Sequence, residues 1–227
     1  MAIYDINGNV INSDSASAEL VTPITNKKIC LIGDSNTQYS GNIIKEYMEN
    51  TYGCIFTPLG YAGATWENAE GVTSDYSAIG RVNALIANAD SNNLCNEYDI
   101  VTIMMGTNCN TAGEITDTSE TLTTMCGAIR YCLEKLCYYF RQKKIGVILP
   151  PQRAELNDFQ NEKNNLIKSI CEDFSIPTLD MYTRSQITAE SMTPDGNTLY
   201  FNDGLHFGGN GQIQFCQTYG KWVAYEL

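Results

Sequence analysis

The sequence predicts an α/β fold: a three-layer α/β/α sandwich around a mostly parallel sheet of five strands. Two patterns predict it. Short apolar segments without polar and apolar alternation recur along the chain, which is typical of parallel strands covered on both faces. Between them lie segments whose apolar residues recur at spacings of three and four, as in amphipathic helices. Because strands and helices alternate, we expect a parallel sheet with right-handed crossover connections.

The amino-terminal segment differs from the rest of the chain. It is polar, and Asn7-Gly8 is a turn signal within it. We expect residues 1–26 to form an arm or small hairpin outside the core, and residues 27–227 to form one folded domain. The segment has no basic start and no apolar block, so it does not resemble a secretory signal. A cytoplasmic location is therefore the default expectation, with export or association with a larger particle as the alternative.

Five apolar segments are the expected strands. They are residues 29–32, 54–59, 100–105, 145–149 and 176–179. The first three end at a glycine, which is Gly33, Gly60 or Gly106, and the fourth ends at Pro150. The last segment is the weakest of the set, because Pro177 has no N–H to donate to a neighbouring strand.

The clearest helix carries an apolar stripe at positions 122, 125, 126, 129, 133, 136, 137 and 140. Asp117 and Glu120 resemble a capping box before this stripe. Lys143-Lys144 follows it, where cations interact favourably with the helix dipole. Two further helices are expected over residues 159–174 and 213–223. The second of these is expected to begin with a cap at Asn210.

The composition excludes several classes of protein. The chain has 227 residues, with 14 Lys and Arg against 26 Asp and Glu, which gives a net charge of −12. Nucleic acids and anionic membranes both need basic surfaces, so neither is expected as a main partner. No apolar run approaches the roughly 20 residues of a membrane-spanning helix, so no membrane insertion is expected.

The cysteines do not form a recognisable framework. The chain has nine of them, no Cys-x-x-Cys pair and a single histidine. One histidine cannot complete a Cys/His zinc set by itself. We therefore expect reduced, mostly buried thiols and no bound metal. A cysteine-based redox or metal protein is a third interpretation, since Cys126, Cys132 and Cys137 fall on one expected helix.

Four short motifs follow expected strands or precede the last helix. They are Gly33-Asp34-Ser35, Gly60-Tyr61-Ala62-Gly63-Ala64-Thr65, Gly106-Thr107-Asn108 and Asp203-Gly204-Leu205-His206. Ligands of open α/β sheets bind beyond the carboxyl ends of the strands, so these motifs are expected to converge on one rim. Each motif alone is a weak signal, and a lone histidine is more often structural. Their joint occurrence in this order favours a catalytic site.

Taken together, the motifs resemble those of the SGNH (GDSL-type) hydrolase family over most of the chain. The resemblance implies a flavodoxin-like fold and a carboxylic ester hydrolase that needs no cofactor. It implies that Ser35 is the nucleophile and that His206 and Asp203 are the base and the acid of a catalytic triad. It also implies three donors to an oxyanion hole: the N–H groups of Ser35 and Gly63 and the side-chain amide of Asn108.

Elementary chemistry supports these roles independently. A serine hydroxyl is a poor nucleophile until a base takes its proton, and imidazole, with an ordinary pKa of about 6.5, suits that task near neutral pH. The second ring nitrogen needs an acceptor that fixes the tautomer, and a nearby carboxylate supplies it. Two residues depart from the family pattern, Cys109 where Asp is common and Pro58 where Asn is common, but neither departure removes a catalytic atom.

The substrate is expected to be a small ester. Four aromatic residues flank the motifs: Tyr61, Trp66, Phe201 and Phe207. Tyr61, Trp66 and Phe207 are candidates for stacking on a sugar ring or an acyl chain, with core packing as the alternative. No long apolar lid segment is present, which favours short acyl groups. We therefore expect a serine esterase for short-chain acyl esters, with O-acetyl groups on a carbohydrate preferred.

A second hypothesis comes from a different class of protein. The chain would then be a catalytically idle carbohydrate-binding or appendage protein that keeps the fold. The polar arm at residues 1–26 favours this hypothesis, because such an arm can dock a domain onto a larger assembly. The intact set of motif residues argues against it.

Overall fold

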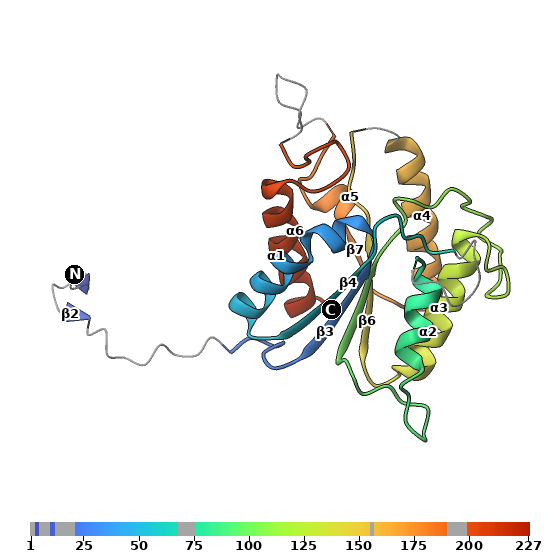
Figure 1. Ribbon diagram of the computed structural model, residues 1–227, viewed down its shortest axis with the longest axis horizontal. Helices are drawn as coiled ribbons and strands as arrows, with labels where there is room; N and C mark the ends of the chain where they lie inside the picture. The colour runs from blue at the N-terminus through green and yellow to red at the C-terminus, as the bar shows by residue number, and fades with distance from the viewer. Residues whose placement is uncertain (1–2, 5–9, 12–20, 68–75, 155–156, 190–198) are drawn as a thin grey trace.

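The computed structural model describes residues 3–4, 10–11, 21–67, 76–154, 157–189 and 199–227. Its five-stranded sheet has the order β4-β3-β5-β6-β7, and all neighbouring strands run parallel. The strands are β3 Lys28–Gly33, β4 Ile55–Gly60, β5 Ile100–Met104, β6 Lys144–Leu149 and β7 Thr178–Asp180. Helices cover both faces of the sheet, so the expected three-layer α/β/α sandwich is confirmed (Figure 1).

Two groups of helices form the outer layers (Figure 1). One face carries α1 Ser35–Tyr52, α5 Met181–Arg184 and α6 Gly209–Tyr225, and the other carries α2 Ala78–Ile86, α3 Met125–Tyr139 and α4 Asn157–Asp173. Each face encloses its own cluster of buried apolar side chains. Within the described residues, none of the helices is both long and apolar enough to cross a membrane.

The sheet aligns three strand ends that matter for the site. Gly33 at the end of β3 is in register with Gly60 of β4 and with Met104 of β5. The segments that follow these strands therefore start side by side at one rim. All residues of β5 are buried, which explains the apolar run without alternation in a strand covered on both faces.

The start of α3 differs from the sequence prediction. Its cap is Thr124, whose hydroxyl accepts a hydrogen bond from the N–H of Gly127 at 3.2 Å, and not the capping box of Asp117 and Glu120. The Asp117 carboxylate instead accepts a hydrogen bond from the Thr124 hydroxyl at 2.7 Å. Asp117 thus supports the cap from the preceding turn, because a threonine closer to the helix supplies the first acceptor.

Three smaller expectations about element ends are also corrected or refined. Asn210 lies inside the first turn of α6, and Gly208 occupies the cap position without a side-chain hydrogen bond. Lys143 and Lys144 lie beyond the end of α3, and Lys144 is the first residue of β6. Pro177 precedes β7, so its missing N–H does not interrupt a strand.

The packed domain begins earlier than residue 27. The Ile24 side chain is only 3% exposed and belongs to a core cluster. The hydroxyl of Thr22 donates a hydrogen bond to the carbonyl of Tyr52, at the end of α1, at 2.8 Å. The boundary expected at residue 26 is therefore too late. Earlier in the chain, β1 Ile3–Tyr4 pairs antiparallel with β2 Val10–Ile11, and residues 1–2, 5–9 and 12–20 of the expected arm lie outside the described residues.

The thiols behave as small apolar side chains. All nine cysteines are free, and eight of them are buried. Burial raises the pKa of Cys54 and Cys126 to about 11, which disfavours the reactive thiolate. Among the described residues, no three His, Cys, Asp or Glu side chains are grouped as a metal ion would require.

Candidate active site

Ser35 occupies the sharp connection between β3 and α1. It is the first residue of α1, and Asp34 before it is the helix cap, whose carboxylate accepts a hydrogen bond from the N–H of Asn36 at 3.0 Å. A side chain at Gly33 would collide with Thr37, so the strand can turn into the helix this tightly only with glycine. The Ser35 hydroxyl is thereby held at the rim of the sheet.

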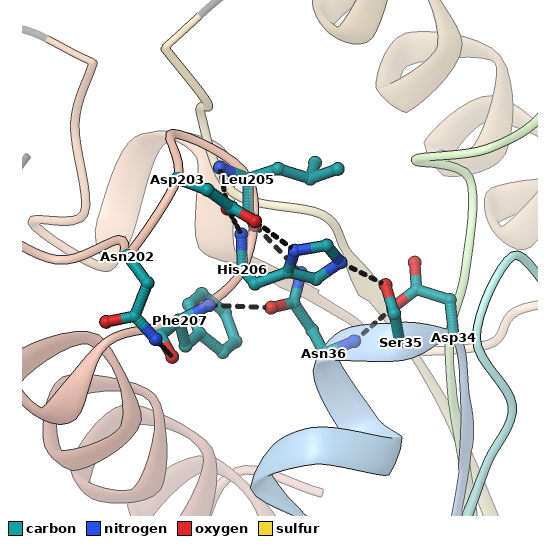
Figure 2. A network of polar contacts seen from close by, with 8 residues as sticks. All are labelled: Asp34, Ser35, Asn36, Asn202, Asp203, Leu205, His206 and Phe207. Carbon is teal, nitrogen blue, oxygen red and sulfur yellow. Dashed lines mark hydrogen bonds and ion pairs between the residues drawn. The ribbon is translucent and has the colours of Figure 1, made fainter.

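The side chains of Asp203, His206 and Ser35 form a hydrogen-bonded series (Figure 2). The Nδ1 atom of His206 lies 2.6 Å from Oδ2 of Asp203, and Nε2 lies 3.0 Å from Oγ of Ser35. The other Asp203 oxygen accepts the N–H of His206 at 2.8 Å and that of Leu205 at 3.1 Å. This turn explains the spacing of three residues, because it folds the carboxylate back beside the imidazole.

Asn36 ties the two halves of this series together, and sequence reasoning did not find it. Its Oδ1 accepts the N–H of Phe207 at 2.9 Å, and its Nδ2 donates to the carbonyl of Leu205 at 3.2 Å (Figure 2). Asn36 is buried. It therefore fixes the backbone on both sides of His206 relative to the start of α1. The one signal of this role in the sequence was the position of Asn36 directly after Ser35.

The two acidic residues of the site have opposite pKa shifts. Burial of Asp203 opposes ionisation, but hydrogen bonds from the ring and backbone of His206 and from the backbone of Leu205 outweigh it and lower the pKa to about 2. Burial of Asp34 raises its pKa to about 6, although hydrogen bonds from Asn36 and Thr107 partly oppose that rise. Asp203 is thus the carboxylate that stays ionised beside the imidazole.

Gly63 and Asn108, from the segments that follow β4 and β5, line one cavity of about 470 Å³. Gly63 has a φ of +79° and is exposed, which suits glycine in the left-handed region. The Asn108 side chain donates a hydrogen bond from Nδ2 to the carbonyl of Ala64 at 3.0 Å. The loops that follow β4 and β5 are therefore joined directly, and both expected oxyanion donors lie at the same rim as Ser35.

Lys163 of α4 is a second residue that sequence reasoning did not assign to the site. Its side chain is buried, and Nζ donates to the carbonyls of Gly106, Thr107 and Cys109 at 2.6, 3.2 and 3.2 Å. These carbonyls flank Asn108 in the loop after β5. The signal was present in the sequence as a lysine on the otherwise apolar stripe of a helix.

The aromatic residues expected to bind substrate are mostly core residues. Trp66 is fully buried, and its Nε1 donates to the carbonyl of Met105 at 3.0 Å. Phe207 is 3% exposed and packs between Phe201 and Phe215. The interpretation of Trp66 and Phe207 as stacking residues is therefore wrong, because neither ring has a face for a ligand.

Tyr61 is the aromatic candidate that keeps access to the surface. It is half-buried and lies edge-on to Tyr76 with ring centroids 4.2 Å apart.

The departure from the family pattern at Cys109 has a structural explanation. Its buried Sγ accepts a hydrogen bond from the N–H of Trp66 at 3.3 Å, so the thiol acts as part of the core beneath the loop.

A parallel α/β/α sandwich with a hydroxyl, an imidazole and a carboxylate in series at its carboxyl rim has the architecture of a serine hydrolase. The comparison with protein families agrees with this class. The chain belongs to the GDSL-like lipase/acylhydrolase family, a family of ester hydrolases, whose model matches residues 29–217.

Solved structures share the fold at low sequence identity. A protein from Lactobacillus plantarum is 18% identical with a TM-score of 0.71, covering 90% of this chain and 99% of its own. A possible lipase from Chitinophaga pinensis is 17% identical with a TM-score of 0.63, covering 86% and 96%. An acetylxylan esterase from Geobacillus stearothermophilus is 13% identical with a TM-score of 0.56, covering 90% and 97%. No protein of curated function matches the chain in sequence.

Proposed function

We propose that the protein is a serine esterase that hydrolyses short-chain acyl esters, with O-acetyl groups on a carbohydrate as the preferred substrate. The observation that carries the proposal is the hydrogen-bonded series of Asp203, His206 and Ser35 at the carboxyl rim of the sheet. Membership of a family of ester hydrolases supports the reaction type. The O-acetyl carbohydrate has the support of one structural neighbour, which is described as an acetylxylan esterase.

Proton transfer in this mechanism follows the series. Asp203 accepts the N–H of Nδ1, which leaves the lone pair of Nε2 directed at the Ser35 hydroxyl 3.0 Å away. As Oγ attacks the ester carbonyl, Nε2 takes the hydroxyl proton and the carboxylate stabilises the imidazolium. The pKa of Asp203 is about 2, so at neutral pH this residue stays ionised and does not itself take the proton.

The oxyanion of the tetrahedral intermediate needs fixed donors. The N–H of Ser35 is in the first turn of α1, where N–H groups have no carbonyl partner within the helix. Gly63 and Asn108 line one cavity, and we expect the N–H of Gly63 and Nδ2 of Asn108 to be donors there. One of the two hydrogens on Nδ2 is used on Ala64, which leaves the other for the oxyanion.

Collapse of the intermediate completes the first half of the reaction. The imidazolium gives its Nε2 proton to the departing alkoxide, the ester C–O bond breaks, and the acyl group remains on Ser35. Water then attacks the acyl carbonyl while Nε2 takes one of its protons. That proton returns to Oγ as the acid leaves, which restores the starting enzyme.

Turnover of p-nitrophenyl acetate tests the proposal. We expect hydrolysis without added metal, unchanged by EDTA, and a nearly complete loss in Ser35→Ala with an unchanged circular dichroism spectrum. Specificity, as kcat/KM, is expected to be higher for acetyl than for octanoyl esters. A folded protein that turns over no ester would instead support the idle binding or appendage protein.

A carbohydrate substrate is tested separately at Tyr61, the aromatic candidate that has access to the surface. If this ring stacks on the sugar, Tyr61→Ala should lower kcat/KM more for an acetylated xylo-oligosaccharide than for p-nitrophenyl acetate. An equal loss on both substrates would argue against the sugar-binding role of Tyr61.

A further inference from the structure

The cavity that holds Gly63 and Asn108 also holds two cationic side chains, Arg153 and Lys163. Among the described residues that line it, there is no aspartate or glutamate. This is unexpected for a chain with 26 acidic residues against 14 basic ones. Positive charge is therefore concentrated beside the expected oxyanion donors of an otherwise acidic protein.

The Arg153 guanidinium is left without a partner within the described residues. Its Nε is buried and has no hydrogen-bond acceptor among the residues that the structure describes. Three other arginines use their guanidinium groups: Arg130 and Arg184 form ion pairs, and Arg141 donates to backbone carbonyls. A guanidinium that lacks acceptors is costly to keep, and a ligand with an anionic oxygen in the cavity that Arg153 lines would supply acceptors to its terminal N–H groups.

Backbone hydrogen bonds tie the segment of Arg153 to α4 and to the turn that carries Asp203 and His206. Its own N–H donates to Oδ1 of Asn157 at the start of α4, at 2.9 Å. The next residue, Ala154, donates its N–H to the carbonyl of Gly204 at 2.9 Å. Gly204 lies in the turn between Asp203 and His206, so the segment with Arg153 connects that turn to the cavity.

Lys163 contributes charge to the cavity but has little capacity to bind a ligand directly. Its three N–H donors are all used on loop carbonyls. Its charge is also partly balanced by the buried carboxylate of Glu67, which acts on both Lys163 and Cys109. Among the described residues that line this cavity, Arg153 is therefore the cation that keeps free donors.

We propose that Arg153 forms an anion subsite that binds a carboxylate of the ester substrate, so that the enzyme selects esters with a negative charge. The planar guanidinium suits a carboxylate because it can donate two parallel hydrogen bonds. The carboxylate belongs either to the acyl part or to the alcohol part of the ester. This inference rests on the proposed esterase function.

Two matched pairs of esters test the subsite and its two sources of carboxylate. For the alcohol part, 4-acetoxybenzoate is compared with the neutral 4-acetoxybenzamide. For the acyl part, the monophenyl ester of adipic acid is compared with its terminal amide. The ratio of kcat/KM for the charged over the neutral ester is measured in wild type and in Arg153→Gln. Comparing the ratio between enzymes cancels the intrinsic reactivity of each ester.

We expect Arg153→Gln to lower the charged-to-neutral ratio about 10- to 100-fold for one pair, which matches the loss of a hydrogen bond to a charged group. The pair affected identifies the part of the ester that carries the carboxylate. Arg184→Gln, at a surface arginine paired with Glu226, is the matched control and should leave both ratios unchanged. Ratios that are the same in wild type and Arg153→Gln for both pairs would overturn the subsite.

A protein that hydrolyses none of the four esters would refute the proposed function without deciding the subsite. Calorimetric titration of 4-acetoxybenzoate and of monophenyl adipate decides it in that case. Binding of either compound to wild type that is lost in Arg153→Gln supports the subsite. Equal binding in the two proteins, or no binding in either, overturns it.

Discussion

Asn108 combines two tasks in one amide group. One hydrogen of Nδ2 joins the loops after β4 and β5 through Ala64, and the other is proposed to bind the oxyanion. We expect Asn108→Ala to lower kcat about 100- to 1000-fold with little change in KM, because the donor acts mainly on the charged intermediate. Saturation kinetics with p-nitrophenyl acetate measure both constants.

Asn110→Ala is the matched control for this change. Asn110 is exposed and lines the same cavity, but it is not expected to contact the reacting carbonyl. Its kcat should stay within about 3-fold of wild type, a change of the size that surface substitutions produce. A rise in KM alone for Asn108→Ala would show that Asn108 binds the ground state and is not an oxyanion donor.

Asp34 makes the stability of the protein depend on pH. Burial raises its pKa from 3.8 to about 6, so the folded chain holds this proton more tightly than the unfolded chain. The free energy of unfolding should therefore decrease as pH rises from about 4 to about 6, by on the order of 2–3 kcal/mol from this residue. Asparagine can replace aspartate as a helix cap without the charge.

The measurement is urea denaturation of wild type and Asp34→Asn across this pH range. The difference in unfolding free energy between the two proteins should grow in favour of the variant as pH rises. Other acidic residues titrate equally in both proteins and cancel in the difference. A difference that stays constant with pH would contradict the raised pKa.

At the scale of elements, α4 positions the loop after β5 through the single ammonium group of Lys163. Without it, three carbonyls around Asn108 lose their shared donor. We expect Lys163→Met to lower kcat about 10- to 100-fold, because a loop displaced by about 1 Å misplaces the oxyanion donor. We therefore expect Lys163 to be a positioning residue, whose effect passes through Asn108.

A double-mutant cycle separates positioning from a general loss of stability. If Lys163 acts through Asn108, then adding Lys163→Met to Asn108→Ala should lower kcat little further. If the two losses of kcat are additive in the double variant, then Lys163 does not act through Asn108. Denaturation of each variant shows whether the kinetics refer to folded protein, and Lys163→Arg tests whether a cation of another shape can hold the loop.

At the scale of the whole molecule, the packed domain includes residues that the sequence pattern assigned to an arm. Ile24 lies in the core and Thr22 bonds the end of α1. We expect a chain starting at residue 21 to keep esterase activity with a small loss of stability. A chain starting at residue 27 should lose several kcal/mol more, because it lacks both a buried isoleucine and a buried hydrogen bond.

Thermal unfolding of the two truncated chains and the full chain provides the measurement. Equal melting temperatures for the two truncations would contradict the packing role of Ile24 and Thr22.

The same chains test the proposed docking role of the arm. A partner that binds the full chain but not the chain starting at residue 21 would locate the docking contact before residue 21.

The sequence by itself determined the class of fold and the residues of the main motifs. A continuous apolar run is a local property of a strand that is buried on both faces, so β3, β5 and β6 were predicted within one or two residues of their ends. The motif residues Ser35, Asp203 and His206 were equally local signals. Their position at strand ends implied convergence on one rim, because parallel strands have their carboxyl ends on one side.

The tertiary structure decided which side chains meet and which are buried. Lys163 and Asn36 reach loops far from them in the chain. Trp66 and Phe207 lie in the core although they adjoin the motifs. A one-dimensional pattern shows which face of an element is apolar, but it does not show which loop packs against that face. The contacts that hold Asn108, and the lack of an acceptor for Arg153 Nε within the described part of the chain, depend on that packing and were accessible only in three dimensions.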